Sequence, residues 1–147
     1  MQISIALRVC GDLLDHEDIT KTLKIKPHEF KRKGDVRIFK SQKSIVAKFG
    51  MWVWHSKDPS GTLTVNDHVA ALANTFAPVY DKLLGLANAE NAWIDLHFVA
   101  GDNEEDISSV GFLMTAETIA ALYKTGLPVE VTVDALSSTP KSGAGSE

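Results

Sequence analysis

The sequence predicts an α+β domain in which helices pack on one face of a mainly antiparallel sheet, as in a ferredoxin-like sandwich. Two observations lead to this fold class. Almost every strand-like segment has one apolar and one polar face, which is typical of antiparallel sheets with one solvated side. Strand-like and helix-like segments also follow one another without the regular alternation of a doubly wound parallel sheet.

The length and composition of the chain fit one domain. With 147 residues, of which 44% are hydrophobic and 23% charged, the chain can bury one ordinary globular core. The last residues, 137–147, are rich in Ser and Gly and have little to bury. We therefore expect a single α+β domain at 1–136 and a flexible C-terminal tail at 137–147.

The N-terminal segment predicts a strand followed by a short helix. Apolar residues alternate with other residues over 3–9, which is the period of a strand with one buried face. Asp15 can accept backbone N–H bonds as an N-cap, and Ile19 and Leu23 would face the core. Pro27 is expected to stop the helix because it restricts the residue before it.

The middle of the chain combines a polar stretch with an apolar one. Residues 28–44 predict a loop around one weak strand. We then expect one long strand over 45–54 whose odd-numbered residues face the core, namely Ile45, Ala47, Phe49, Met51 and Val53. Trp52 and Trp54 would project together from the opposite face of that strand.

A long helix and a half-buried strand are expected next. Apolar residues recur at helical spacing over 65–83, and Pro78 is expected to kink this helix. The strand over 93–99 places Trp93 and His97 on one face, away from its apolar side chains. We expect it to form a hairpin, through an acidic loop, with a strand that ends at Met114.

The last two predicted elements are a helix and a strand. Thr115 is a plausible N-cap, and Gly126 occupies the position where a helix commonly ends in a left-handed residue. Pro128 follows and cannot continue the helix. Alternating valines over 129–133 then predict the final strand.

Composition restricts the setting and the partners. The formal net charge of −4 argues against nucleic-acid binding, which needs a basic face, and no apolar run is long enough to cross a membrane. The first twelve residues have the pattern of a strand and not of a leader peptide. Cys10 is the only cysteine, so no internal disulfide can form and a reducing compartment is expected. We expect a cytoplasmic protein with neither a nucleic-acid nor a membrane partner.

A series of short motifs resembles a known family. In chain order they are Asp15-His16-Glu17-Asp18-Ile19 before Pro27, Lys33-Gly34-Asp35, Gly50-Met51-Trp52 and Thr125-Gly126-Leu127-Pro128-Val129. Over residues 2–135 the chain resembles the bacterial domain-of-unknown-function family 4279. The resemblance implies a fold and a bacterial cytoplasmic setting. It implies no activity and adds no catalytic residue.

The most informative functional feature is an aromatic second face of the sheet. Trp52 and Trp54 are predicted to leave the core, and Trp93 and His97 share a face of another strand. If these strands are close in the sheet, the side away from the helices presents aromatic rings, which typically mark a binding surface. The alternative is that the loop before the long strand, or a second subunit, covers the rings.

The basic loop offers a second group of candidates. Lys31, Arg32 and Lys33 could clamp an anion, although basic loop residues are usually solvated. Asp35 could grip a ligand or act as a base, but an Asp after Gly commonly bonds its own backbone to fix a turn. The candidate binding residues are therefore Arg32, Lys33, Asp35, Trp52, Trp54, His55, Trp93 and His97.

No catalytic, metal or cofactor motif is recognisable in the sequence. The five histidines lack the paired spacing of a metal site, and Cys10 has no basic partner nearby in the chain. We predict no cofactor. An enzyme with a dispersed site, which would use Asp35, His55 and Arg32, remains an alternative function.

The leading hypothesis is a non-catalytic interaction module that uses the face around the tryptophans. Self-association would bury that face, and a protein partner or a small ligand would serve the same purpose. An immunity or antitoxin-like protein that masks a toxin is a further alternative. A small acidic domain suits that role because its charge would steer a basic partner.

Overall fold

The computed structural model describes residues 2–100 and 111–135. The strands are β1 (Gln2–Gly11), β2 (Glu29–Lys31), β3 (Val36–Ile38), β4 (Ser44–Val46), β5 (Gly50–Lys57), β6 (Asn91–Ala100) and β7 (Val129–Ala135). The helices are α1 (His16–Leu23), α2 (Val65–Phe76) and α3 (Ala116–Lys124), and η1 (Ala77–Lys82) is a short 3-10 helix.

Five strands form one mixed sheet in the order β2-β5-β1-β6-β7, and β3 and β4 form a separate two-stranded hairpin. The three pairs that involve β1 and β2 are antiparallel, whereas β6 and β7 run parallel and are joined through α3. The predicted α+β class is thus confirmed, with one parallel pair in the sheet. β1 and β2 flank α1 in the chain and run in the same direction, with β5 between them. The sheet is not antiparallel throughout, because β7 lies parallel to β6.

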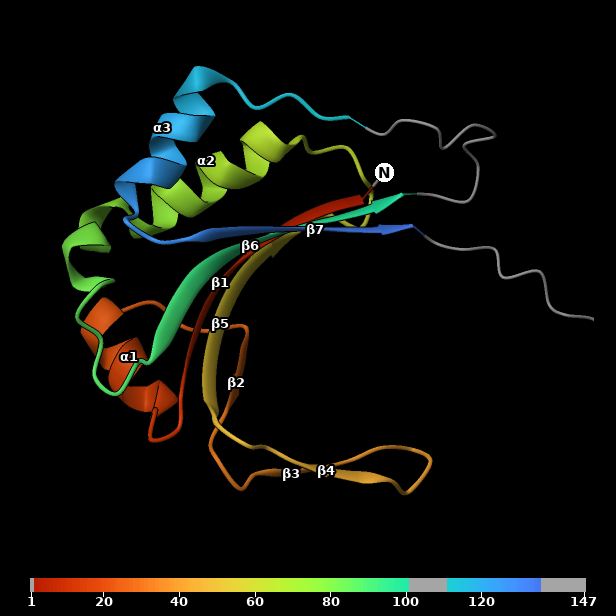
Figure 1. The fold of residues 1–147 in the computed structure, drawn as a ribbon, viewed down its shortest axis with the longest axis vertical. Coiled ribbons are helices and arrows are strands. Elements are labelled where there is room, and N and C mark those ends of the chain that lie inside the picture. Colours follow the sequence, from red (N-terminus) through yellow and green to blue (C-terminus); the bar gives the residue numbers. More distant parts are fainter. Residues whose placement is uncertain (1, 101–110, 136–147) are drawn as a thin grey trace, which may run out of the picture.

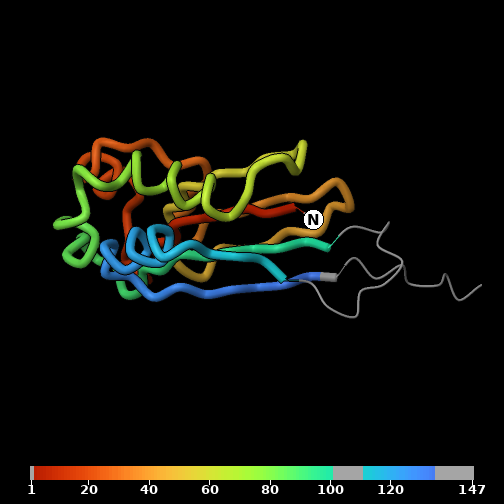
Figure 2. Tube along the Cα trace, turned by 90° about the horizontal axis from the view of Figure 1, so that it is seen from above, coloured from red at the N-terminus to blue at the C-terminus, as the bar shows by residue number. Residues whose placement is uncertain are grey.

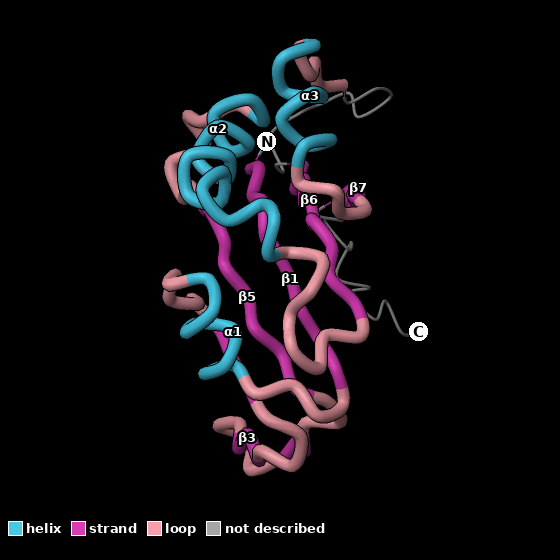
Figure 3. The backbone as a smooth tube through the Cα atoms, turned by 90° about the vertical axis from the view of Figure 1, so that its left-hand side faces the viewer, coloured by secondary structure: helices cyan, strands magenta, loops and turns pink. Residues whose placement is uncertain are grey.

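All three α-helices cover the same face of the sheet (Figures 1 and 3). Asp15 caps α1 by accepting a hydrogen bond from the Glu17 N–H, as predicted. The long predicted helix stops at Phe76, and Pro78 lies in the first turn of η1, which confirms the kink. The core consists of residues from this side of the sheet and from the helices: Ile5, Leu7, Val9, Ile19, Leu23, Trp52, Trp54, Val69, Leu72, Phe76, Ile94, Leu96, Phe98 and Leu122.

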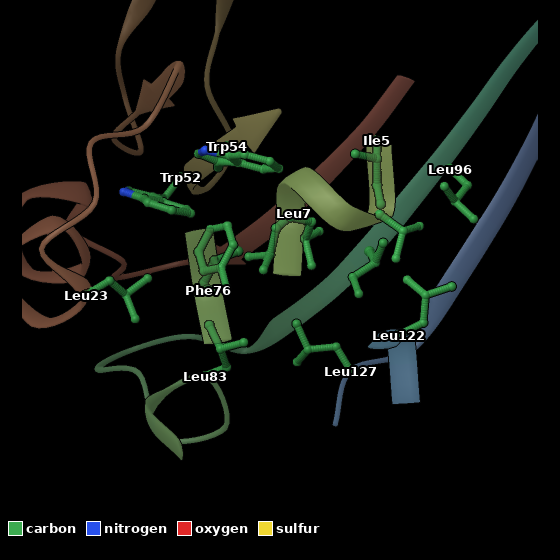
Figure 4. Packing of buried hydrophobic residues seen from close by; sticks show 14 of the residues in the cluster. Ile5, Leu7, Leu23, Trp52, Trp54, Phe76, Leu83, Leu96, Leu122 and Leu127 are labelled. Carbon is green, nitrogen blue, oxygen red and sulfur yellow. The ribbon is translucent and has the colours of Figure 1, made fainter. Parts of the chain in front are cut away.

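The predicted orientation of the two tryptophans is wrong. Trp52 is fully buried and Trp54 is 8% exposed, and both lie on the helix-covered face. The ring of Phe76 meets both indoles edge-on, with centroids 6.3 Å from Trp52 and 5.3 Å from Trp54 (Figure 4). The Trp52 Nε1–H also donates to Thr20 Oγ1 on α1, at 3.1 Å. These tryptophans are core residues, so they leave no surface for a partner.

The error arises because the predicted strand over 45–54 is two strands. β4 ends at Val46 and β5 begins at Gly50, where a Cβ would stand 2.3 Å from the Leu14 carbonyl oxygen. The odd-numbered apolar residues therefore do not belong to one continuous face. Val53 is also buried, on the other side of β5. Because both faces of β5 are apolar, alternation alone does not decide which of them meets the helices.

Residues 36–46 form an arm that stands out from the sheet on the side opposite the helices (Figure 1). The prediction of one weak strand over 28–44 missed part of this structure, since β2 and β3 both lie there and β4 begins at Ser44. We call residues 36–46 the β3–β4 arm. An isolated two-stranded hairpin is marginally stable in water, so the arm depends on its connections to the domain.

Helices α2 and α3 lie side by side over the sheet (Figure 2). Asn66 Oδ1 joins them by accepting from Thr118 Oγ1 at 2.6 Å, and Thr115 caps α3 as predicted. Gly126 has a φ of 71°, the left-handed conformation expected after this helix. Among the described residues, no helix combines the length and the apolar composition that a membrane span requires.

Two further predictions concern segments near the C-terminus. The hairpin after β6 was expected to run to Met114, but residues 111–114 form no strand, and the acidic loop lies outside the described residues. Phe112 instead stacks on Phe98, with ring centroids 4.1 Å apart. The final strand is confirmed as β7, and the tail at 137–147 also lies outside the described residues.

Candidate functional site

The sheet has a second face that the helices do not cover, which we call the open face. Its residues follow from the strand register, because alternate residues of each strand point away from the core. They include Ser4, Ala6, Arg8 and Cys10 on β1, Glu29 and Lys31 on β2, Met51, Val53, His55 and Lys57 on β5, Trp93, Asp95, His97 and Val99 on β6, and Glu130, Thr132 and Asp134 on β7. Three of the predicted site residues, His55, Trp93 and His97, lie here.

A groove of about 520 Å³ lies between the open face and the β3–β4 arm. Side chains of the sheet form its floor, and side chains of the arm form its outer wall. Its lining residues are Arg8, Glu29, Phe30, Lys31, Asp35, Val36, Arg37, Phe39, Ile45, Ala47 and Met51. We call this space the arm groove. Asp35 is the one predicted site residue that contributes to it.

Arg8 is a charged residue on the floor of the arm groove. Its Nε donates to Asp95 Oδ2 at 3.0 Å, and both side chains are largely shielded from solvent. This bond fixes the guanidinium while its two terminal nitrogens remain available to a ligand. Two polar atoms beside the pair, Asp95 Oδ1 and Trp93 Nε1, are buried and have no hydrogen-bond partner among the described residues. Such atoms are uncommon in folded proteins and favour a site that is completed by something else.

Two more cations stand at the rim of the arm groove. The Lys31 ammonium lies 4.9 Å from the ring centre of Phe49, and the Arg37 guanidinium lies 5.0 Å from that of Phe39. Aromatic rings orient a cation without neutralising it. Neither cation has a carboxylate within 4.0 Å among the described residues.

Two smaller hollows continue the arm groove along the open face. The first, of about 110 Å³, shares Arg8 and Glu29 with it and also contains His55 and His97. The second, of about 240 Å³, shares Lys57 and His97 with the first. The open face is therefore hollowed along much of its length.

The histidines of these hollows have defined partners. His97 Nε2 lies 2.6 Å from Asp134 Oδ2, and the rings of His55 and His28 stack with centroids 4.2 Å apart. Burial lowers the pKa of His55, and the positive charge of Lys57 and of His28 lowers it further. His55 is therefore held in its neutral form more strongly than a solvated histidine.

The predicted anion clamp is divided by the fold. Lys31 points to the arm groove, whereas Arg32 bonds Asp15 at 2.9 Å and Lys33 bonds Asp12 at 2.8 Å, both on the segment that leads into α1. The Glu17 N–H and, after it, the Arg32 guanidinium lower the pKa of Asp15. Arg32 and Lys33 therefore serve as structural ties outside the arm groove.

Asp35 has the turn role that the sequence favoured. Its Oδ2 accepts from the Arg32 backbone N–H at 2.7 Å, and its own N–H donates to the Arg32 carbonyl at 3.0 Å. The three residues considered for a dispersed active site do not meet in one hollow. Asp35 lines the arm groove, His55 lines the hollow beyond Arg8, and Arg32 lines neither.

Neither Cys10 nor a cluster of metal-binding side chains adds a further candidate site among the described residues. Cys10 lies half-buried on the open face, where burial raises the pKa of its thiol and keeps it protonated. Within residues 2–100 and 111–135, no three His, Cys, Asp or Glu side chains are grouped so that they could hold a metal ion.

Comparison with known protein families shows which family this chain belongs to. The family described as Domain of unknown function (DUF4279) matches residues 1–136. The chain belongs to the DUF4279 family. This confirms the resemblance that the motifs indicated. No curated protein and no solved structure matches this DUF4279 domain.

The sequence analysis missed most of the residues that line the arm groove in this DUF4279 domain. Arg37 and Phe39 were not among its candidates because this part of the arm was expected to be a loop with one weak strand, and Arg8 of β1 was not among them either. One signal was present: Arg8 is the only charged residue in β1, the central strand. A charge inside a central strand indicates that one face of the sheet is not covered by the core.

Proposed function

We propose that this DUF4279 domain is a non-catalytic binding module whose arm groove takes a small molecule with an apolar part. The observation that carries the proposal is the groove itself. Its volume of about 520 Å³ falls within the range of about 300–1,000 Å³ that is usual for ligand pockets. The bacterial cytoplasmic setting that the sequence indicated stays a prediction.

The wall of the arm groove supports an apolar ligand. Ile45 and Phe39 line it from the arm, and Met51 adds an apolar side chain on the floor. Ile45 is 57% exposed in the protein alone, although isoleucine is among the residues most often buried. A ligand that covers this wall would remove apolar surface from water, which contributes roughly 25 cal/mol for each Å².

The lining also explains why we assign no catalytic step. The residues that border the arm groove include no Ser, Thr, Cys or His, so a hydroxyl or thiol nucleophile paired with an imidazole base is not present in the lining. The carboxylate of Asp35 already accepts a hydrogen bond from the Arg32 backbone N–H, which fixes its own turn. The arrangement holds and orients a molecule without transforming it.

A neutral fluorescent probe, N-phenyl-1-naphthylamine, tests the proposal. We expect the probe to bind and Ile45→Asp to weaken binding by about tenfold or more, because a charge in the wall must be desolvated. Ile38→Asp is the matched control. Ile38 lies on the same arm and is 74% exposed, but it does not line the groove.

Fluorescence titration of the purified protein measures the affinities, and thermal unfolding checks that each variant is folded. The proposal fails if the folded wild-type protein does not bind the probe. It also fails if Ile45→Asp and Ile38→Asp have equal effects.

Self-association is a second candidate function, and the outer side of the arm favours it. Ile38 and Val46 are exposed and lie outside the groove lining. A two-stranded hairpin gains stability when a further strand or surface covers it, and a second copy of the chain offers the same arm. Light scattering over increasing concentration would show a dimer that Ile38→Asp disrupts. A monomer at all concentrations would remove this candidate.

A further inference from the structure

We propose that the arm groove selects ligands that carry a carboxylate beside their apolar part, and that Arg8 is the residue that binds this carboxylate. The inference rests on the proposed function and deepens it by naming the ligand class. It depends on three features of the groove, namely its local charge, the fixed position of Arg8 and the state of the acidic residues nearby.

The arm groove presents cations on a chain that is acidic overall, with a formal net charge of −4. The groove lining contains three cations, Arg8, Lys31 and Arg37, and two acids, Glu29 and Asp35, and Asp95 balances Arg8 from outside the lining. Among the described residues, Lys31 and Arg37 have no carboxylate within 4.0 Å. Such cations attract an anion to the groove, whereas the acidic remainder of the surface repels it.

Arg8 is built as an anion anchor. The bond from its Nε to Asp95 holds the guanidinium plane, and residues of β5 and β6 flank it on the sheet. A guanidinium that is fixed through Nε still presents its terminal N–H groups, which match the two oxygens of a carboxylate. Arg8 borders both the arm groove and the adjoining hollow, so its free edge is reached from the cavity.

The other charges strengthen this assignment. Asp35 accepts from the Arg32 backbone N–H and belongs to its own turn. Lys31 and Arg37 lie against aromatic rings, where they keep their charge and face the same groove. Glu29 is the acid that opposes an incoming anion, since Val53 alone separates it from Arg8 in the strand register.

The apolar wall defines the remainder of the ligand. Ile45 and Phe39 of the arm lie across the groove from Arg8 on the sheet, so a bound molecule has its acid group on the sheet and its apolar body against the arm. An aromatic or aliphatic carboxylic acid has this chemistry. A basic or doubly charged ligand does not match it.

Three probes of nearly equal shape test the inference: naphthalene-2-carboxylate, its neutral amide and the cationic naphthalen-2-ylmethylamine. Isothermal titration at low and high salt measures their affinities for the full chain. We expect the carboxylate to bind about tenfold more tightly than the amide, as charged hydrogen bonds add affinity of this order. The amine should bind most weakly, and the preference for the carboxylate should fall with added salt.

Variants locate the effect. Arg8→Gln should abolish the preference for the carboxylate over the amide. Arg32→Gln is the matched control, because it removes the same group from a position outside the groove. Glu29→Gln should raise carboxylate affinity by about twofold, since it removes the opposing charge. Arg8→Lys keeps the charge without the fork and should retain part of the preference.

The outcomes separate the two proposals. Equal binding of all three probes, unchanged in Arg8→Gln, overturns the carboxylate assignment and leaves the proposed binding function standing. If Arg32→Gln and Arg8→Gln reduce the preference for the carboxylate equally, the assignment is also overturned, because the preference would then depend on the overall charge of the protein and not on Arg8. Failure of the wild-type protein to bind either the naphthalene probes or N-phenyl-1-naphthylamine overturns both proposals.

Discussion

The two faces of the sheet carry similar residues in different surroundings. On the helix-covered face, Trp52 and Trp54 pack around Phe76, and the indole N–H of Trp52 has a partner in Thr20. On the open face, Trp93 is half-buried and its indole N–H has no partner among the described residues. Tryptophan is thus a core residue on the covered face, whereas on the open face it has a buried N–H donor without a partner among the described residues.

The comparison teaches that the identity of a residue does not assign it to a face. The helices cover one side because α1, α2 and α3 each present an apolar stripe to it. The other side keeps Arg8 and Asp95 in the middle of the sheet, and a hydrophobic layer over this pair would bury a charge pair at a cost. Charged side chains on a central strand therefore mark the side of the sheet that the helices leave uncovered.

The largest expected difference between the faces is in the free energy of unfolding. Trp52→Ala should lower it by about 3–5 kcal/mol, because the change leaves a cavity in the core and removes the bond to Thr20. Trp93→Ala should lower it by about 1 kcal/mol or less, since the ring is partly exposed and an unpaired donor is removed with it. Urea unfolding of the two variants measures both values.

Equal losses of stability in these two variants would contradict the assignment of the faces. Leu113→Ala is a suitable control, because Leu113 is exposed on the segment before α3 and its replacement should leave stability unchanged. It should unfold at nearly the wild-type urea concentration.

A smaller difference is expected in the response to pH. Burial lowers the pKa of both His68, on the covered side, and His55, on the open face. The unfolded chain binds these protons near the ordinary value of 6.5, so below that pH the unfolded state takes up more protons than the folded state. Stability is therefore present above pH 6.5 and lost as the pH falls through 6.5 toward the lowered values.

Replacement of either histidine should make this acid-induced loss of stability less steep. His68→Gln should have the larger effect, because His68 is fully buried with its Nδ1 2.9 Å from Ser56 Oγ, whereas His55 is partly exposed. Urea unfolding between pH 7.5 and 5.0 gives the slopes. An unchanged slope in His68→Gln would show that other groups control the acid response.

The smallest effect is expected for a hydrogen-bonded pair at the edge of the open face. His97 and Asp134 join β6 and β7, and their side chains are 37% and 63% exposed. Asp134→Asn should change the free energy of unfolding by about 0.5 kcal/mol or less, because solvent and salt screen an exposed pair. A loss near that of Trp52→Ala would mean that the open face contributes to the core.

The sequence predicted the elements whose pattern is local. The helix caps at Asp15 and Thr115, the kink at Pro78 and the left-handed Gly126 depend on neighbouring residues, and all are present in the structure. The parallel pairing of β7 depends instead on contacts between distant segments. No pattern within 129–135 distinguishes a parallel neighbour from an antiparallel one.

The candidate site was predicted only in part, for a related reason. Asp35, His55, Trp93 and His97 do lie on or beside the hollowed face, but the choice of Trp52 and Trp54 followed from an alternation that both faces of β5 satisfy. The arm groove exists because residues 36–46 leave the sheet between β2 and β5. A chain excursion of this kind is decided by tertiary packing, and its residues resemble an ordinary strand.

The position of β1 has a consequence for the way the chain folds. β1 is the first strand to be synthesised and the middle strand of the sheet, and its partners β5 and β6 begin only at Gly50 and Asn91. During synthesis on the ribosome, β1 therefore lacks its partner strands until most of the domain has been translated, and its apolar side chains stay uncovered for that time. Pairings between such distant segments place the chain among slowly folding topologies. β7, which pairs with β6 alone among the described strands, can join the sheet after its centre has formed.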